Sequence, residues 1–329
     1  MPPSAKIEDV RRRLILPMLV SAACRSRRET VLLTFPESYG HHLSQSHGRY
    51  AAHPVRAVYL QSYAKMMEAL LAGDGDVATA AYDAVLPLAA DGRDAVAFCS
   101  LAQRPGIVLA GRAEIARIED LHGKTIGIPG PGSSSHFLLN AILRKHGLDP
   151  SAVPTAAIGV AASAVAAVTQ RKVDAAMLTN LGLSTLLRRN VPLRILADLR
   201  QAVPSRHYFG VDKLPSLCLI ARRQWLDANP TRARAIAQAF LESNRWMARH
   251  TPDEIRNALP AEARAEDAAA DLAAIEGMLP TLDLDGRISP ESAGAALGLV
   301  AASVPRLEAA RIDLSQTFTN IFLPESPLQ

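Results

Sequence analysis

The sequence predicts an α/β protein with two lobes, each an open, mostly parallel sheet flanked by helices, followed by a helical C-terminal extension. Short apolar strands alternate with helical stretches from residue 29 onward, which is typical of βαβ units. One step occurs in each half: residues 67–78 and 164–176 both run from a helix through a polar turn to an Asp and a small-residue strand. The length of 329 residues fits about two domains.

Residues 1–28 are predicted to be a leader and linker. Arg11-Arg12-Arg13 precedes the apolar run 14–20 and the small residues 21–23, which is the pattern of a secretion signal and faintly that of a twin-arginine signal. The apolar run is too short to span a bilayer. We therefore expect export to the periplasm. Cys24 would be lipidated if the imperfect lipobox before it works; a disordered basic tail is the alternative.

Composition fits a soluble globular protein, with 49% hydrophobic and 21% charged residues. The net charge is +4, about half of it in the leader, and no basic stripe with interleaved aromatics is present, so no nucleic-acid partner is expected. Cys99 and Cys218 are single residues in apolar runs, which favours buried thiols over a disulfide or a catalytic pair.

The first half is predicted to contain strands at 30–35, 55–60, 76–80 and 95–102, with a helix at 64–72. Ligands of open α/β sheets sit beyond the carboxyl ends of the strands. The residues that follow these strand ends are candidates for the site, namely Pro36, Glu37, Ser38, Ser62, Tyr63, Tyr82 and Asp83.

The second half repeats the pattern with strands at 107–111, 124–128, 155–158 and 174–178 and a helix at 161–169; Thr179 and Asn180 stand at a strand end. Residues 126–136, IGIPGPGSSSH, run from a strand through a Gly/Pro turn into a helix that ends near Gly147. Unpaired N–H groups of the first helical turn, with nearby hydroxyls, form a pocket for an anionic group. The alternative is an ordinary structural N-cap.

Beyond residue 193 we expect a strand at 194–199, a polar, Pro-rich crossing at 201–215 that contains Tyr208, a strand at 217–221 and a long helix at 229–249. The remainder is Ala-rich and mostly helical.

The ordered set of these motifs, spread over about residues 29–323, resembles a known family: the periplasmic solute-binding proteins of the nitrate/taurine/alkanesulfonate type of ABC importer, the SsuA/NMT1-like group. The matching stretches are LLAG and DVA at 70–78, IEDLHGKTIG at 118–127, PGSSSHF at 131–137, IG at 158–159, AVAAV at 164–168, VDAA at 173–176, ARR at 221–223, NP at 229–230 and IDLS at 312–315.

The resemblance implies a type II periplasmic-binding fold, with 29–107 and 219–329 in the first lobe and 108–218, including the hinge crossings, in the second. It also implies a monomer that clamps a small anionic molecule of the sulfonate, taurine-like, nitrate or carboxylate class between its lobes. The closed form would deliver that molecule to an inner-membrane permease and its ATPase. No catalysis, cofactor or metal is expected.

The resemblance carries over the candidate site residues Pro36, Glu37, Ser38, Ser62, Tyr63, Tyr82, Asp83, Ser133, Ser134, Ser135, His136, Thr179, Asn180 and Tyr208. The three serines are expected to hold the head group, and the tyrosines to pack on an organic body. Glu37 and Asp83 would repel a pure anion, which leaves room for a ligand with a cationic or hydrogen-donating part. Tyr63, Lys65 and Thr179-Asn180-Leu181 depart from the usual family pattern, which leaves the ligand's identity open.

An enzyme on the same fold, similar to a pyrimidine-precursor synthase or a sulfinate hydrolase, is the alternative, but the cysteine-rich iron motif of the synthase is absent and both internal cysteines are expected to be buried. A receptor that signals to a membrane sensor is also open. His41, His42 and His47 lie close together, but no partner with zinc-like spacing accompanies them.

Overall fold

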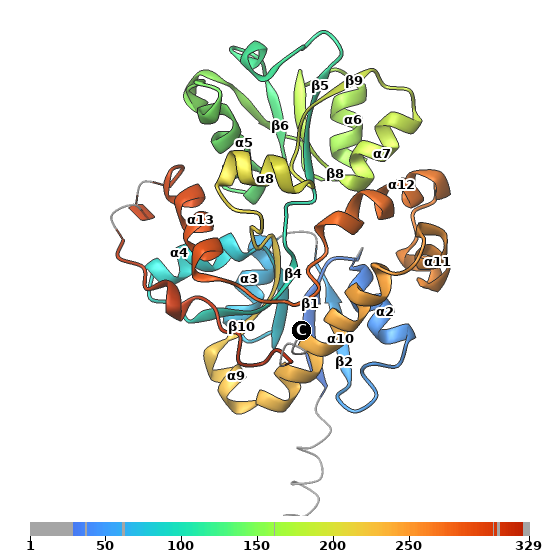
Figure 1. The fold of residues 1–329 in the computed structure, drawn as a ribbon, viewed down its shortest axis with the longest axis vertical. Helices are drawn as coiled ribbons and strands as arrows, with labels where there is room; N and C mark the ends of the chain where they lie inside the picture. Colours follow the sequence, from blue (N-terminus) through green and yellow to red (C-terminus); the bar gives the residue numbers. More distant parts are fainter. Residues whose placement is uncertain are drawn as a thin grey trace, which may run out of the picture.

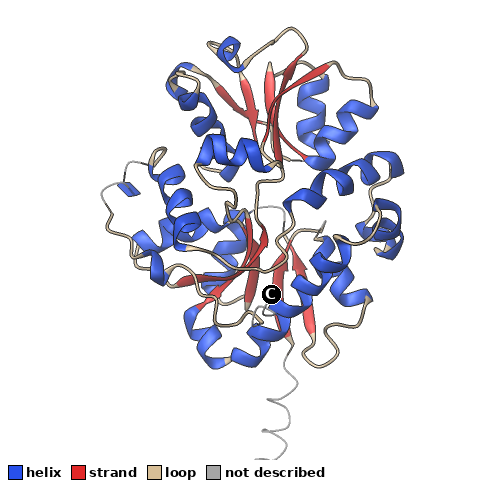
Figure 2. Ribbon diagram, viewed as in Figure 1, coloured by secondary structure: helices blue, strands red, loops and turns tan. Residues whose placement is uncertain are grey.

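The computed structural model of the protein describes residues 29–324, except 37, 61, 62, 161, 305, 308 and 309. Figure 1 shows two α/β lobes stacked along the long axis of the molecule, and Figure 2 shows helices flanking the sheet of each lobe. The predicted α/β class with two mostly parallel sheets is confirmed. The predicted leader, with Cys24, and the candidate site residues Glu37 and Ser62 lie outside the described residues.

The first lobe has a five-stranded sheet in the order β2-β1-β3-β10-β4. β1 pairs in parallel with β2 and β3, whereas β10 is antiparallel to β3 and β4. Its strands are β1 (Thr30–Thr34), β2 (Val55–Tyr59), β3 (Val77–Ala80), β4 (Ala95–Ala102) and β10 (Leu217–Arg222). Its helices are α2 (Tyr39–Ser46), α3 (Tyr63–Ala72), α4 (Val85–Ala90), α9 (Arg223–Ala228) and α10 (Pro230–Met247), with the 3-10 turn η1 (Tyr82–Ala84).

The second lobe has the corresponding order β7-β6-β8-β5-β9, with β5 antiparallel to β8 and β9. In both sheets the antiparallel strand is the one that the chain enters directly after crossing from the other lobe. The strands are β5 (Ile107–Arg112), β6 (Ile126–Ile128), β7 (Thr155–Ala157), β8 (Ala175–Thr179) and β9 (Leu193–Asp198). The helices are η2 (Ile118–Leu121), α5 (Ser134–Lys145), η3 (Pro150–Ala152), α6 (Ala162–Thr169), α7 (Asn180–Arg188) and α8 (Ala202–Phe209).

The predicted repeated step has the same hydrogen bonds in both lobes. Asp76, just before β3, accepts a bond from the amide of Val31 at 2.9 Å through Oδ2 and donates its own amide to the Val31 carbonyl at 2.9 Å. Asp174, just before β8, makes the same pair of bonds with Thr125, at 2.9 and 2.8 Å. Each Asp therefore fixes the start of its strand to the neighbouring parallel strand.

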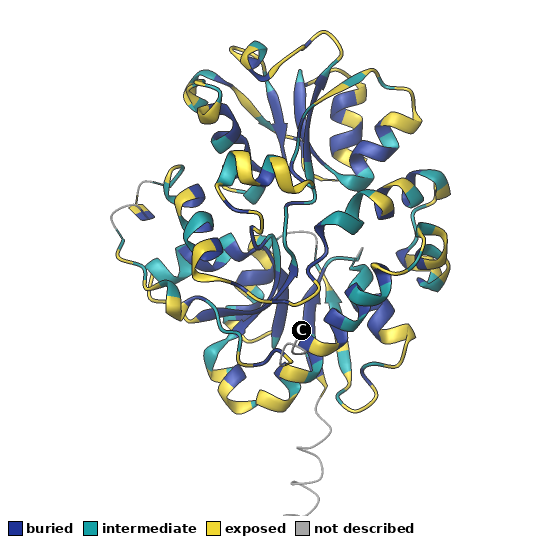
Figure 3. Ribbon diagram, in the orientation of Figure 1, coloured by how far each residue is buried: buried dark blue, intermediate teal, exposed yellow. Residues whose placement is uncertain are grey.

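The core lies on both faces of each sheet, and Figure 3 shows the strands buried beneath partly exposed helices. Apolar side chains of α10, such as Phe240, pack with Phe98 on one face of the first sheet, whereas α6 and α7 cover one face of the second with side chains such as Val165 and Leu186. A further apolar cluster includes Leu33 from the first sheet and Leu109 from the second. The two lobes are therefore joined by apolar packing as well as by the chain.

The C-terminal extension, residues 251–324, contacts the second lobe as well as the first. Ser184 on α7 donates to the carbonyl of Ala270 on α12 at 2.8 Å, and Asn140 on α5 donates to Oγ of Ser303, just after α13, at 3.1 Å. In Figure 1, α12 and α13 lie on opposite sides of the junction between the lobes. The elements are α11 (Pro252–Ala258), η4 (Ala261–Ala263), α12 (Ala268–Met278), η5 (Leu279–Thr281), α13 (Pro290–Ala301) and η6 (Leu314–Gln316).

One predicted segment is wrong. Residues 201–215 do not form an irregular crossing throughout, because residues 202–209 form α8. Pro204 stands in the first turn of this helix, where the missing N–H would have had no helical partner. Gly210 then ends the helix in the left-handed conformation, with φ of 77°. Within the described part of the chain, no helix is both long enough and apolar enough to span a bilayer.

Candidate functional site

The carboxyl ends of the first-lobe strands meet the start of α5 in the second lobe. Asp83 follows β3 in η1, and its carboxylate lies near the hydroxyl of Ser134, the first residue of α5. Both side chains are partly buried. Burial raises the pKa of Asp83 to about 6, although the nearby Ser134 hydroxyl and Ala84 amide act in the opposite direction. The candidate site therefore has a desolvated carboxylate where the two lobes touch.

Tyr63 and Phe35 form an aromatic wall beside this carboxylate. Their rings pack edge to face, with centroids 4.9 Å apart. Burial raises the pKa of the Tyr63 phenol, and the charge of Asp83 raises it further, so the hydroxyl stays protonated and can donate. Tyr63 is the first residue of α3, and the predicted grouping of Tyr63 with Asp83 is therefore present in the structure.

The three serines at the start of α5 have different roles. Ser133 is the N-cap, and its Oγ accepts a bond from the amide of His136 at 3.3 Å. Ser134 contacts Asp83, and Ser135 is buried. Nδ1 of His136 accepts the amide of Gly132 at 3.1 Å, so this imidazole supports the turn. Within the described residues the amides of Ser134 and Ser135 have no acceptor, which leaves two donors at the positive end of the helix.

The loop after β1 is held by a histidine that the sequence analysis had not connected with the site. The ring Nε2 of His42 on α2 lies 2.6 Å from the carbonyl oxygen of Pro36, so the imidazole N–H donates to it. Ser38 is the residue directly before α2. Nδ1 of His41 lies 3.3 Å from the hydroxyl oxygen of Tyr50. Both neighbouring histidines therefore position or pack against other residues of the lobe.

Thr179 and Asn180 lie at the contact between α7 and α12. Oγ1 of Thr179 accepts the Gly182 amide at 3.3 Å and caps α7. Oδ1 of Asn180 accepts a bond from Arg200 at 3.2 Å, and Arg200 in turn pairs with Asp198 at 2.6 Å. A Cβ built on Gly277 of α12 would lie 3.2 Å from Asn180 Oδ1. Asn180 is therefore part of the interface with the extension.

Two of the candidate tyrosines are not brought to this point. Tyr82 is fully buried, and its hydroxyl lies 2.6 Å from Oγ1 of Thr317. Tyr208 lies beside the C-cap of α5, where its hydroxyl is 3.3 Å from Nε2 of His146. The twelve-residue length of α5 separates its two ends by about 18 Å at ~1.5 Å per residue. Packing in the core and against α5 accounts for both side chains.

The hinge between the lobes has three chain segments side by side. The amide of Leu214 donates to the Gln103 carbonyl at 2.8 Å, and the amide of Gln103 donates to the Thr281 carbonyl at 2.8 Å. Arg104 joins these segments, because its guanidinium donates to the carbonyls of Arg200 at 3.2 Å, of Asp212 at 3.4 Å and of Pro280. The sequence analysis missed Arg104 and the third segment, for which the sequence carries no evident signal.

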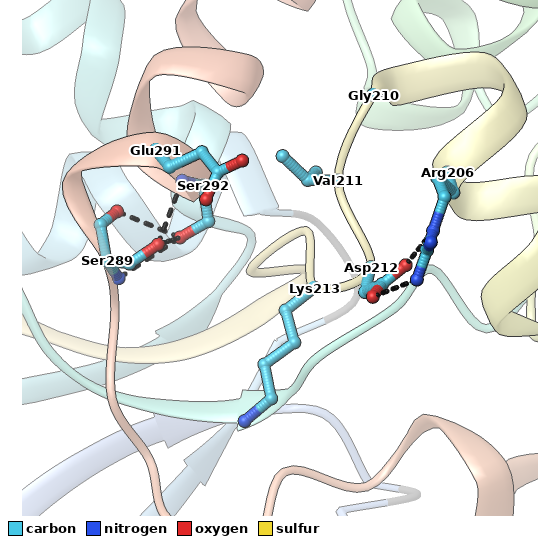
Figure 4. A pocket seen from close by; sticks show the side chains of 8 residues that line it. All are labelled: Arg206, Gly210, Val211, Asp212, Lys213, Ser289, Glu291 and Ser292. Atoms are coloured by element: carbon cyan, nitrogen blue, oxygen red, sulfur yellow. Dashed lines mark hydrogen bonds and ion pairs between the residues drawn. The ribbon is translucent and has the colours of Figure 1, made fainter.

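A cavity of about 430 Å³ lies between α13 and the segment that links α8 to β10 (Figure 4). Figure 4 shows Arg206 paired with Asp212, at 2.6 Å between Nε and Oδ1, with Lys213 pointing away from that pair. None of the candidate site residues borders this cavity. Its lining consists of Arg206, Gly210, Val211, Asp212, Lys213, Ser289, Glu291 and Ser292.

The internal cysteines are on opposite faces of the first sheet. Cys218 pairs in register with Ser100, and Cys99 pairs with Leu219, so the two thiols point to different apolar clusters. Both are free and buried, and burial raises both pKa values well above the usual range. A thiol kept neutral in this way is a poor nucleophile.

Comparison with known proteins supports the architecture. A structure from Bordetella bronchiseptica RB50 aligns with a TM-score of 0.80 and 28% identity, over 90% of this chain and 96% of that chain. The periplasmic aliphatic sulphonate binding protein SsuA from Escherichia coli aligns with a TM-score of 0.68 and 21% identity, over 92% and 95% of the two chains. The periplasmic nitrate-binding protein NrtA from Synechocystis PCC 6803 aligns with a TM-score of 0.64 and 12% identity, over 89% and 86%.

The last two similarities are similarities of fold. A comparison with curated protein sequences finds no match. The NMT1/THI5 like family model, however, matches residues 38–255, which is more than half of the chain and includes Asp83, Ser134 and most of both lobes. The chain belongs to the NMT1/THI5-like family.

Proposed function

We propose that this protein is the substrate-binding component of an ABC importer, which captures a small organic molecule between its lobes and delivers it to a membrane permease and its ATPase. The contact between Asp83 and Ser134 carries the proposal, because it lies where the strand ends of one lobe meet the helix start of the other. The family membership and the names of the similar structures, a sulphonate-binding and a nitrate-binding protein, support it.

The hinge gives the proposal a mechanism. A ligand that contacts both lobes does so only when they are close together, so its binding free energy favours the closed arrangement. The three hinge segments, joined by Arg104, would guide this closure. A permease would then distinguish the closed protein from the open one.

The ligand is proposed to have an anionic group, such as a sulfonate or carboxylate. Two unpaired amides at the start of α5, those of Ser134 and Ser135, favour an anion through the partial positive charge of the helix end. Tyr63 and Phe35 would pack on the organic part. Pro36, Glu37, Ser38, Ser62, Ser133 and His136 complete the proposed surroundings, and we leave out Tyr82, Thr179, Asn180 and Tyr208, whose contacts lie elsewhere.

Export to the periplasm, a lipid on Cys24 and a monomeric state belong to the same proposal, on the strength of the leader pattern and the family. The enzyme alternative of the hydrolase type needs a reactive cysteine in the site, and the burial of Cys99 and Cys218 speaks against either of them in that role.

A binding screen tests the proposal. Purified protein without its leader is scanned by thermal shift with sulfonates, carboxylates, nitrate and pyrimidine precursors, because a ligand that binds the folded state raises the melting temperature. Compounds that raise it are titrated by calorimetry against wild type, Ser134→Ala and the control Ser163→Ala, an exposed serine on α6. We expect Ser134→Ala to weaken binding about tenfold and Ser163→Ala to leave it unchanged. Equal affinities for all three proteins would remove the Ser134 hydroxyl from the site.

A further inference from the structure

We propose that α12 is a latch between the lobes: it is fixed to the first lobe, and its contact with α7 of the second lobe holds the two lobes together before any ligand binds. The inference rests on the closing motion of the proposed function and adds to it a contribution that the protein itself makes to closure. In Figure 1, α12 lies directly below α7, at the junction of the lobes.

A buried aspartate fixes α12 to the first lobe. Asp271 of α12 is fully buried, and its Oδ1 accepts a bond from the hydroxyl of Tyr39, the first residue of α2, at 3.0 Å. Its Oδ2 accepts a bond from Nε of Arg256 on α11 at 2.9 Å. Ile275 of α12 and Leu43 of α2 belong to one apolar cluster. Because breaking a buried ion pair is costly, we expect α12 to move with the first lobe.

The start of α12 is bonded to the second lobe. Ser184 on α7 is buried, and its hydroxyl donates to the carbonyl of Ala270 at 2.8 Å. Ala270 directly precedes Asp271, so bonds to the two lobes meet at adjacent residues of one helix. Arg188 on α7 lies 4.0 Å from the carboxylate of Asp267, but both side chains are exposed and such a pair contributes little. A separation of α7 from α12 would therefore break the buried Ser184 bond.

The end of α12 approaches the second lobe through a glycine. A Cβ built on Gly277 would lie 2.5 Å from Nη1 of Arg200 and 3.2 Å from Oδ1 of Asn180. Asp198 holds Arg200, with 2.7 Å between Nε and Oδ1 and 2.6 Å between Nη2 and Oδ2. The guanidinium would strain this charge-assisted pair if it moved aside. A side chain at position 277 should therefore separate α12 from the second lobe.

These contacts favour one of two arrangements. Because α12 is fixed to the first lobe, its contacts with α7 and with Arg200 exist only while the lobes are close together. A contact made in only one of two states shifts the equilibrium toward that state. Ligand affinity then depends on the fraction of molecules already closed. Residues of the latch, outside the ligand site, would thus set part of that affinity.

Single-molecule fluorescence energy transfer measures the lobe separation without a ligand. Dyes are attached at Asp74→Cys and Lys172→Cys, exposed positions in the turns before β3 and β8, one in each lobe. These turns lie at the strand ends away from the junction, so the distance between the dyes changes as the lobes open. The background is Cys24→Ser, in which the buried Cys99 and Cys218 are not labelled.

Two matched glycine substitutions test the latch. Gly277→Leu and Gly298→Leu each replace a helical glycine and gain the same helix propensity, but a Cβ at Gly298 of α13 would meet no atom of another element within 4 Å. In dialysed protein with no compound added, we expect Gly277→Leu to lower the ratio of closed to open molecules at least about tenfold. Ser184→Ala should lower it about fivefold, and Gly298→Leu should keep the wild-type ratio.

The outcomes separate the latch from the binding function. A wild-type ratio in both Gly277→Leu and Ser184→Ala would overturn the latch, and so would an equal drop in Gly298→Leu. If Gly277→Leu fails to fold, as judged by circular dichroism, Ser184→Ala decides alone because it removes only a hydroxyl. Since no ligand is present, an unchanged ratio overturns the latch while the binding function stands. A ligand screen without any hit contradicts the binding function and leaves the measured ratios as they are.

Discussion

The Asp83 carboxylate of the first lobe lies close enough to the Ser134 hydroxyl of the second for that hydroxyl to lower its pKa, so an acid from one lobe lies at the helix start of the other. The start of α5 carries a partial positive charge that would attract an anion. In this contact the protein itself places a negative group, Asp83, at that position. A ligand must therefore share this position with Asp83 or displace it. The charge state of Asp83 should affect both the stability of the closed arrangement and the choice of ligand.

The first prediction concerns pH. The pKa of Asp83 is raised from 3.8 to about 6 in the folded protein, so the folded state retains a proton that the unfolded state loses. Its contribution to stability is present below pH 3.8 and is lost as the pH rises through about 6. The melting temperature of Asp83→Asn should therefore rise relative to wild type between pH 4 and pH 7.

Other groups near Asp83 do not produce this difference. Burial raises the pKa values of Tyr63 and Cys218, so both stay neutral in this range. Burial lowers the pKa of His136, but His136 is present in both proteins and its effect cancels in the comparison. If the difference in melting temperature between Asp83→Asn and wild type stayed constant from pH 4 to pH 7, Asp83 would not be desolvated.

The second prediction concerns the aspartate that precedes β3 in the first lobe and the corresponding one before β8 in the second. Asp76 and Asp174 make the same backbone bonds, but Asp174 also pairs with Arg112 at 2.8 Å. Replacing either by Asn should destabilise the protein by about 1–3 kcal/mol, and Asp174→Asn should be the more costly because it also removes the carboxylate that pairs with Arg112. Urea unfolding of the two variants measures this. The opposite order would contradict the assignment of the extra ion pair.

The strands, including those of the repeated step, could be predicted from the sequence more readily than the helices. The Asp-to-strand step and the strand positions follow from local patterns, because each strand is a short apolar run between polar turns, and all ten predicted strands correspond to observed ones. Helices without a distinct periodic face were harder. The VLPLAA sequence of α4 is apolar all round, and α8 contains a proline that favoured a loop until its place in the first turn was known.

The candidate site was predictable at the strand ends and less so elsewhere. Asp83 and Ser134 follow predicted strands, and the general rule for open sheets predicts them at the strand ends, where the structure has them. Tyr82 is next to Asp83 in sequence, yet η1 turns it inward to Thr317, and sequence adjacency carries no information about that turn. Tyr208 sits at the far end of α5 because α8 packs there, a tertiary contact with no local signal.

The third prediction concerns the hinge. Arg104→Met removes the donors for the carbonyls of Asp212 and Pro280, in the other two hinge segments, and of Arg200, in the turn before α8. We expect a loss of about 1–3 kcal/mol in the free energy of unfolding. Arg117 is exposed and pairs with Asp120 three residues along the chain. Arg117→Met should therefore stay within about 0.5 kcal/mol of wild type. Equal losses in the two variants would assign no special role to Arg104.

The fourth prediction concerns the thiols. Cys99 and Cys218 are fully buried, and their raised pKa values keep them protonated near neutral pH. In a Cys24→Ser protein, we expect no rapid reaction with a thiol-specific disulfide reagent under native conditions, and reaction of both cysteines in denaturant. A thiol that reacts quickly in the native protein would revive the hydrolase alternative.

The central claim is that a ligand binds between Asp83 and the start of α5. A crystal structure of the protein with the tightest ligand from the screen tests it most directly. Ligand density within hydrogen-bonding distance of Asp83 and the Ser134 amide is the predicted result. Density instead in the cavity beside Arg206, Asp212 and Lys213, with the Asp83 contact unchanged, would contradict the account.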